Sequence, residues 1–171
     1  MKRIFLLVVC LLGLWLQRSS AEHITLSELG TIRAETIPLR SQFAVNGSEF
    51  ARRTEDLSDR NRQQAALEEL QRGNIPHFFR NLKPVRLSQT LVSGETMTAI
   101  IWVMPDYLAI GSDKDFLRIP LAYPSAATFA KEFGFVLPTK KMVDAIYEQS
   151  AFHLKPQPMP PGPQMRSNRY F

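Results

Sequence analysis

The sequence predicts an α+β domain built on an antiparallel β-meander with helices packed on one face. Residues 97–104 form the longest apolar run after the N-terminal segment, and their apolar side chains fall on both faces of an extended strand, as in strands covered on both sides. Pro105-Asp106 and residues 111–115 interrupt this pattern, because proline cannot donate to a sheet ladder and aspartate and glycine favour turns. Short β-favouring segments follow each break, at 107–110 and 116–119, so we expect three strands joined by short turns.

The first twenty-one residues are expected to be a signal peptide. Two basic residues are followed by an apolar core at 4–16 and by small residues at 19–21, an order that predicts cleavage before Glu22. The apolar core is shorter than the roughly 18 residues of a membrane-spanning helix. A lipidated Cys10 is disfavoured because this residue lies inside the apolar core. We therefore expect a secreted or periplasmic protein with no membrane attachment after cleavage of the leader.

Composition narrows the class of protein further. Removal of the leader lowers the formal net charge from +5 to +2, because three of the 21 lysines and arginines lie within it. A near-balanced charge gives no reason to expect nucleic-acid binding. The leader also contains the one cysteine, so the mature domain is expected to have no internal disulfide. About 150 residues is enough for a single domain held together by its core alone.

The mature chain is expected to have three parts. Residues 22–55 have irregularly spaced apolar side chains and predict an extended arm or short strands. Within this part, residues 46–48 read Asn-Gly-Ser, which predicts a tight turn, although it also fits a glycosylation sequon. Residues 56–155 form the predicted α+β core. Residues 156–171 begin with five prolines among the eight residues 156–163, which predicts a polyproline II tail.

Two helical segments are expected at the start of the core. Residues 59–72 predict a helix that Ser58 or Asp59 caps and that Gly73 ends. A short helical turn is expected from Pro76, because proline is favoured in the first turn of a helix.

A β-hairpin before the meander and two helices after it complete the predicted core. Residues 85–92 alternate between apolar and polar side chains and lead through Ser93-Gly94 into the apolar run, as in a hairpin. Residues 124–133 and a following segment capped by Thr139 predict two amphipathic helices that cover one face of the sheet.

Four blocks of sequence occur in order along the second half of the chain. They are W-V-M-P-D-Y-L-A-I-G-S-D at Trp102–Asp113, D-F-L-R-I-P at Asp115–Pro120, L-P-T-K-K-M-V-D-A-I-Y at Leu137–Tyr147 and P-Q-P-M-P-P at Pro156–Pro161. Over roughly residues 72–165 the chain resembles a family of uncharacterised secreted bacterial proteins, a resemblance that implies export but no particular activity. Such relatives continue past the proline segment into a second part with several histidines. A truncated copy is therefore one interpretation of this chain, and a site that needs the second part would then be incomplete.

Four charged residues are candidate ligand-binding residues. Asp106, Asp113 and Asp115 lie at turns next to strand ends, where binding sites are commonly built, and Arg118 lies in a short strand between apolar neighbours. Carboxylates that converge there could bind a cation or serve as acid and base. The alternative is that each aspartate is a turn former whose side chain caps its own backbone. Residues 113–115 lack the further ligands and the closing glutamate of a calcium loop, so no metal site is predicted.

The sequence contains no catalytic signature and implies no cofactor. It lacks His-x-x-x-His, Gly-x-Ser-x-Gly and a phosphate-binding glycine loop. A Ser-His-Asp site would have to be assembled from distant residues, for example Ser112 with His77 or His153. No catalytic residue is assigned.

Two functions fit these observations. The first is a non-catalytic binding or structural module of the bacterial envelope, with an envelope or extracellular partner or polymer; it fits the leader, the proline segment and the missing signature. The second is an envelope hydrolase whose catalytic part is completed by a missing C-terminal region. The sequence leaves open whether the protein is an enzyme.

Overall fold

The computed structural model describes residues 8–9, 26–30, 32–155, 157–158 and 160–162. The predicted signal peptide lies outside these ranges apart from Val8–Val9, and so does most of the proline-rich tail. Within the described ranges, none of the helices combines the length and apolarity needed to cross a bilayer.

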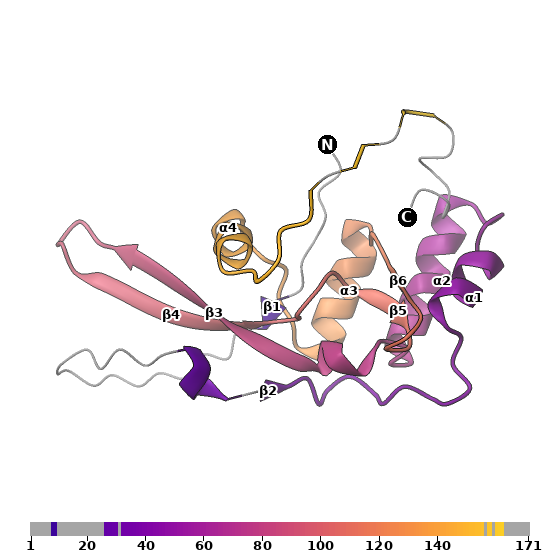
Figure 1. Cartoon of the computed structure of the whole chain (residues 1–171), viewed down its shortest axis with the longest axis horizontal. Coiled ribbons are helices and arrows are strands. Elements are labelled where there is room, and N and C mark those ends of the chain that lie inside the picture. Colours follow the sequence, from indigo (N-terminus) through magenta and orange to yellow (C-terminus); the bar gives the residue numbers. More distant parts are fainter. Residues whose placement is uncertain (1–7, 10–25, 31, 156, 159, 163–171) are drawn as a thin grey trace.

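The described chain is an α+β fold with antiparallel strands, as the sequence predicts (Figure 1). One sheet has the strand order β1-β4-β3-β2, and the second contains β5 and β6. The strands are β1 Val8–Val9, β2 Ile32–Arg33, β3 Asn81–Thr90, β4 Thr96–Val103, β5 Ala109–Gly111 and β6 Phe116–Arg118. The helices are the 3-10 helix η1 Leu26–Leu29, α1 Gly47–Arg53, α2 Asp59–Gln71, the 3-10 helix η2 His77–Arg80, α3 Tyr123–Phe133 and α4 Lys140–Glu148.

Strands β3 and β4 form the long hairpin that the sequence predicts. Their register runs from Lys83 opposite Val103 to Thr90 opposite Thr96. The connecting loop is closed by a bond from the Leu91 amide to the Glu95 carbonyl, 2.8 Å long. Gly94 within this loop has a φ of +83°, a conformation that favours glycine and is common in short hairpin loops.

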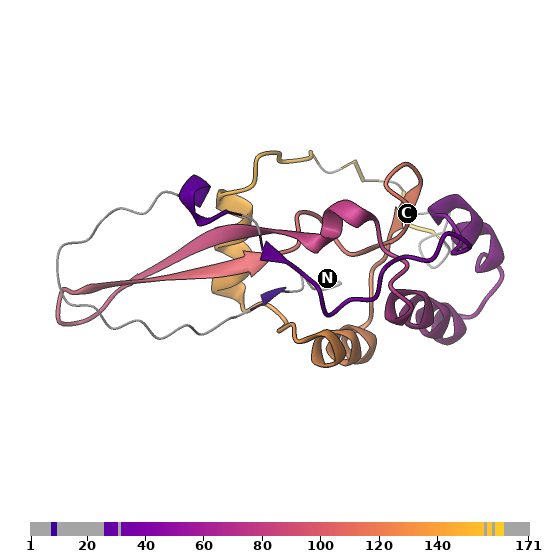
Figure 2. The same cartoon turned by 90° about the horizontal axis from the view of Figure 1, so that it is seen from below.

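This hairpin is buried only at its base. Residues 101–104 of the apolar run are buried, whereas every residue from 88 to 99 is exposed. Residues 88–99, which we call the distal hairpin, project away from the helices (Figures 1 and 2). The predicted two-sided burial of residues 97–104 is therefore confirmed for the second half of the run and wrong for the first half.

The base of the hairpin packs on both faces. Trp102 and Met104 belong to the large core, whereas Ile101 and Val103 alternate to the other face and join Val85 in a smaller cluster. Helix α4 covers this smaller cluster, and its contributing side chains are Met142, Ala145 and Ile146. The structure refines the predicted position of the two last helices, because α4 packs on β3 while α3 packs on α2.

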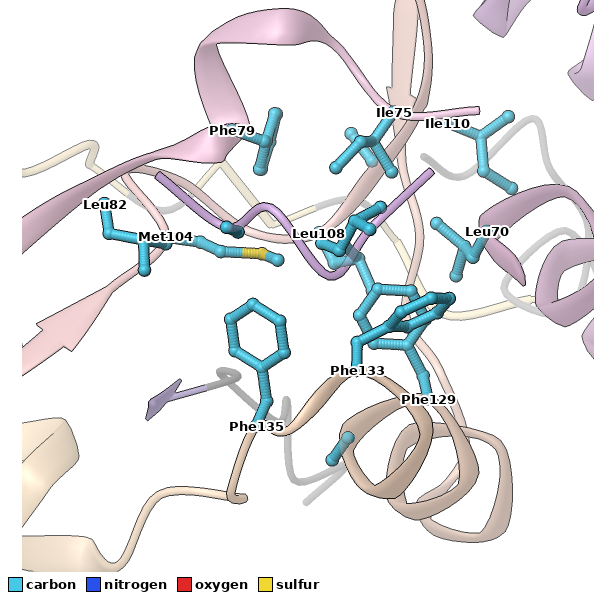
Figure 3. Close-up of a cluster of buried hydrophobic side chains, with 14 of the residues drawn as sticks. Leu70, Ile75, Phe79, Leu82, Met104, Leu108, Ile110, Phe129, Phe133 and Phe135 are labelled. Carbon is cyan, nitrogen blue, oxygen red and sulfur yellow. The ribbon is translucent and has the colours of Figure 1, made fainter. Parts of the chain in front are cut away.

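The large core contains buried side chains from α2, η2, β5 and α3 as well as from the base of the hairpin (Figure 3). Leu70 from α2, Phe79 from η2, Ile110 from β5 and Phe129 from α3 are completely buried in it. Helix α2 begins where the sequence predicts, and the Ser58 hydroxyl accepts a hydrogen bond from the Asn61 amide. The predicted helical turn after Pro76 is η2.

Residues 26–55 differ most from the prediction. The stretch contains one short strand, β2, as one of the two predicted alternatives has it. Ile37 and Phe50 are buried, so the stretch is part of the body rather than an extended arm. The predicted Asn-Gly turn is wrong, because Asn46 stands at the N-cap of α1 and Gly47 begins the helix. A side chain at Gly47 would place its Cβ 2.4 Å from the Phe116 carbonyl carbon, so the glycine allows α1 to contact β6 directly.

Strands β5 and β6 pair with each other and not with β4. Residues 105–108 separate the two sheets, beginning with Pro105, which cannot donate to a ladder. The three strands predicted for the meander are present and antiparallel, but they are divided between two sheets.

Candidate functional site

The four predicted site residues lie at the two ends of the β5–β6 hairpin. Asp106 precedes β5, and Arg118 ends β6 opposite Ala109. Asp113 and Asp115 lie in the turn at the other end of this hairpin, between Gly111 and Phe116. The structure therefore divides the predicted site into two pairs.

Asp106 and Arg118 form an ion pair at the open end of the hairpin. The Arg118 Nε lies 3.1 Å from both oxygens of the Asp106 carboxylate, and Nη2 donates to Oδ2. The same carboxylate accepts a hydrogen bond from the Tyr107 amide at 2.7 Å. The hydrogen bond to Asp106 raises the pKa of the Arg118 guanidinium above its usual value. Arg118 also lies over the Phe116 ring, 5.3 Å from its centroid, so each charge already has a partner within the chain.

Asp115 caps helix α1 from a distant loop. Its Oδ1 accepts hydrogen bonds from the Ser48 amide at 2.9 Å and from the Ser48 hydroxyl at 3.0 Å, and its main-chain carbonyl accepts from the Gly47 amide at 3.0 Å. The side chain of Asn46, at the N-cap position, makes no capping hydrogen bond. Amides at a helix N-terminus need acceptors and favour negative charge, and Asp115 supplies both.

Asp113 makes the equivalent contact with η2. Its Oδ1 accepts a hydrogen bond from the His77 amide in the first turn of η2, and its Oδ2 lies 3.8 Å from the His77 Nδ1. The turn between β5 and β6 therefore joins two helical N-termini through two neighbouring carboxylates. One of the two interpretations of the sequence is that each aspartate caps its own backbone. In the structure Asp113 and Asp115 bind the backbone of other elements, whereas Asp106 accepts from the adjacent Tyr107 amide.

These contacts leave the four residues without a common ligand position. Asp106, Asp113 and Asp115 bind to Arg118, His77 and Ser48 respectively, which lie on separate elements. No cluster of three or more histidine, cysteine or acidic side chains suited to a metal ion occurs within the described ranges. The geometry favours a structural role for the two turn aspartates.

The proposed Ser-His pairings are not formed. The Ser112 hydroxyl accepts a hydrogen bond from the Asp115 amide at 3.2 Å. His77 faces Asp113, and the His153 ring stacks on Tyr147 with its Nε2 2.6 Å from the Tyr147 carbonyl oxygen. The hydrolase interpretation stays a prediction that these contacts do not support.

Arg80 is the buried charge that sequence reasoning missed. It is 2% exposed, and its guanidinium donates to four main-chain carbonyls. The acceptors are Ile75 at 3.2 Å, Pro76 at 3.4 Å, Gly73 at 3.0 Å and Pro38 at 2.5 Å. Burial lowers the pKa of this guanidinium, and the neighbouring charge of Arg33 acts in the same direction. An arginine between aromatic residues and a strand has no sequence signal for burial, because the carbonyls it binds come from backbone that only the fold brings together.

The distal hairpin exposes three apolar side chains that lie near one another in the chain. Val92 at its tip is fully exposed, Met97 is 58% exposed and Leu91 is 40% exposed. Glu95 is the one charged residue between 88 and 99. An exposed apolar group of this kind is typical of a contact surface.

Comparison of the chain with models of protein families, with curated proteins and with solved structures gave no match.

Proposed function

We propose that the protein is an exported, non-catalytic module that binds a protein partner of the bacterial envelope through the distal hairpin. The observation on which the proposal rests is the exposure of residues 88–99, with Leu91, Val92 and Met97 forming the apolar part of that surface. Apolar side chains that a fold keeps in water stabilise a complex when a partner covers them.

The polar residues support a binding role over a catalytic one. The carboxylates of Asp113 and Asp115 are engaged by the backbone of η2 and α1, and Asp106 is engaged by Arg118. A catalytic acid or base must instead reach a substrate, with its proton available for transfer.

Export is supported by the order of the first twenty-one residues, which is basic, then apolar, then small. The resemblance to secreted bacterial proteins points in the same direction. Intact-mass measurement of the protein recovered from outside the cytoplasm is expected to show a chain that begins at Glu22. An unprocessed chain, or one with a lipid on Cys10, would contradict this part of the proposal.

The binding proposal is tested by cosedimentation of the purified protein with isolated bacterial envelopes. Val92→Asp combined with Met97→Asp places charge in the apolar surface and is expected to weaken binding at least about tenfold, since central apolar contacts dominate most interfaces. Ser88→Asp combined with Ser93→Asp adds the same charge to the same hairpin without removing an apolar side chain, and is the matched control.

Three results would overturn the proposal: no binding of the unaltered protein, equal loss in both double variants, or binding that persists after the envelopes are treated with protease. The third result would indicate a polymer rather than a protein. Circular dichroism of each variant checks that the body remains folded.

A further inference from the structure

The chain that follows α4 has a pattern with a period of three residues. Lys155 is followed by Pro158 and then by Pro161, each three residues further on. A polyproline II helix has three residues per turn, so a chain in this conformation places the three side chains along one edge. Each residue from 155 to 160 is a proline or stands directly before one, and both positions favour extended backbone of this kind. The sequence therefore favours an edge with one charged and two apolar positions.

The structure leaves this edge open to solvent. Lys155, Pro158 and Pro161 are exposed, and among the described residues none forms a hydrogen bond or an ion pair with Lys155. No residue described between 150 and 162 belongs to a helix or a strand. Figure 1 shows this part of the chain, in yellow, leaving α4 and following the outside of the molecule. The three side chains of the edge are therefore accessible to another protein.

Contacts with α4 fix the place from which this segment leaves the body. The His153 ring stacks on the Tyr147 ring with the centroids 4.2 Å apart, and the Ser150 hydroxyl donates to the Ile146 carbonyl at 2.6 Å. Leu154, between His153 and Lys155, is almost fully exposed. A segment whose start is held, and whose prolines limit its backbone, loses less conformational freedom when a partner binds it.

We propose that the edge formed by Lys155, Pro158 and Pro161 binds a groove in a protein partner that is lined with aromatic side chains and has an acidic residue at one end. The two prolines would pack on the aromatic rings, and the Lys155 amine would pair with the acidic residue. Grooves of this kind recognise proline-rich segments because such a ligand is already ordered before it binds. This inference does not depend on the proposed function, because the edge shares no residue with the distal hairpin.

Charge favours this partner over a membrane surface or an anionic polymer. Lys155 is the one lysine or arginine between residues 142 and 165. Anionic surfaces and polymers are bound by several basic residues together, because each contributes only a small part of the affinity. A single cation at the end of an apolar edge instead matches a single acidic group, and it fixes the direction in which the segment lies in the groove. A plain spacer would need the prolines but not the charge of Lys155.

Titration of the purified protein against a panel of SH3 domains tests this inference. These domains bind proline-rich segments in aromatic-lined grooves, and the panel consists of domains whose grooves end in acidic residues. At least one domain is expected to bind the unaltered protein. Pro158→Ala combined with Pro161→Ala is expected to weaken that binding at least about tenfold. The matched control is Pro160→Ala combined with Pro163→Ala, which removes two prolines at the same spacing from a different edge and is expected to bind nearly as well as the unaltered protein.

Variants of Lys155 test the charge separately. Lys155→Glu is expected to weaken binding of the same domain at least about tenfold, and Lys155→Arg is expected to preserve it. The Val92→Asp and Met97→Asp variant should bind the domain like the unaltered protein, so a failure of this inference is distinguishable from a failure of the proposed function.

Four results would overturn the inference. They are no binding of the unaltered protein by any domain of the panel, equal loss in the two double proline variants, unchanged binding of Lys155→Glu, and binding of a synthetic peptide of residues 152–163 by a domain that does not bind the whole protein. The last result would show that the folded chain covers the edge.

Discussion

The base and the distal half of the β3–β4 hairpin are continuous in sequence and opposite in environment. At the base, Trp102 faces the large core and Ile101 faces α4; in the distal half, Met97 and Thr98 of the same strand are exposed. The strand is uncharged throughout and would be suitable for burial along its whole length. What differs is the apolar cover, because the apolar side chains of α4 and of the large core pack only on the base. Helix α4 reaches the distal half through a polar contact, the hydrogen bond from the Lys141 amine to the Gln89 side chain.

The two halves of the strand therefore have different roles: the base stabilises the fold, and the distal half is the proposed binding surface. The base contributes apolar burial to the fold, whereas the distal half contributes little to it and is available for contact with another chain. A two-stranded ribbon without further cover is only marginally stable in water, so the distal hairpin depends on its anchored base.

The largest expected effect comes from shortening the buried side chain at the base. Trp102→Ala should lower the free energy of unfolding by about 3–5 kcal/mol, because Trp102 is 8% exposed and its removal leaves a cavity in the large core. Met97→Ala, on the exposed part of the same strand, is the control and should change it by less than about 0.5 kcal/mol. Urea denaturation of the two variants measures both values. Similar losses in the two variants would show that the distal half is covered in solution.

The sequence predicts the elements of the fold better than it predicts their environment. Turn residues and caps fix local structure, so Ser58, Pro76 and Gly94 lie where expected. Helix α1 was not predicted, because its only completely enclosed apolar side chain is Phe50 and its cap, Asp115, comes from a loop far along the chain. No local pattern records such a partner.

The same limit applies to the candidate site. The sequence identifies Asp106, Asp113, Asp115 and Arg118 as unusual because they stand at turns beside short strands. It cannot say which backbone amides lie opposite them, since those amides belong to Ser48 and His77. Asp113 and Asp115 therefore act as caps, but the sequence could not predict that the amides they bind belong to other elements.

An intermediate loss of stability is expected when the cap of α1 is removed. Asp115→Ala removes the acceptor of the Ser48 amide and should lower the free energy of unfolding by about 1 kcal/mol, the usual value of a lost helix cap. Asp115→Asn keeps an oxygen at the same place and is the milder control. Ser48→Ala combined with Asp115→Ala should cost less than the sum of the single changes, because the Ser48 hydroxyl and Asp115 bind each other.

Urea denaturation of the Ser48 and Asp115 single and double variants measures these losses. Binding assays with divalent cations then distinguish a structural cap from a ligand site at Asp115. A structural cap predicts loss of stability and no change in cation binding. A stable Asp115→Ala variant that loses cation binding would revive the ligand-site interpretation.

The smallest expected loss of stability comes from breaking the ion pair between Asp106 and Arg118, which lies just past the base of the hairpin. Asp106 follows the buried Met104 by two residues, yet its partner Arg118 is half exposed, and exposed pairs contribute at most about 1 kcal/mol. Asp106→Asn keeps an acceptor for the Tyr107 amide and removes the charge that Arg118 binds, so the loss should be a fraction of that found for Trp102→Ala. In about 1 M salt the charge interaction is screened over roughly 3 Å, and the difference between Asp106→Asn and the unaltered protein should shrink further. A loss of unfolding free energy as large as that of Trp102→Ala, or one that salt does not reduce, would contradict this prediction. It would show that the buried region extends past Met104 and encloses the ion pair.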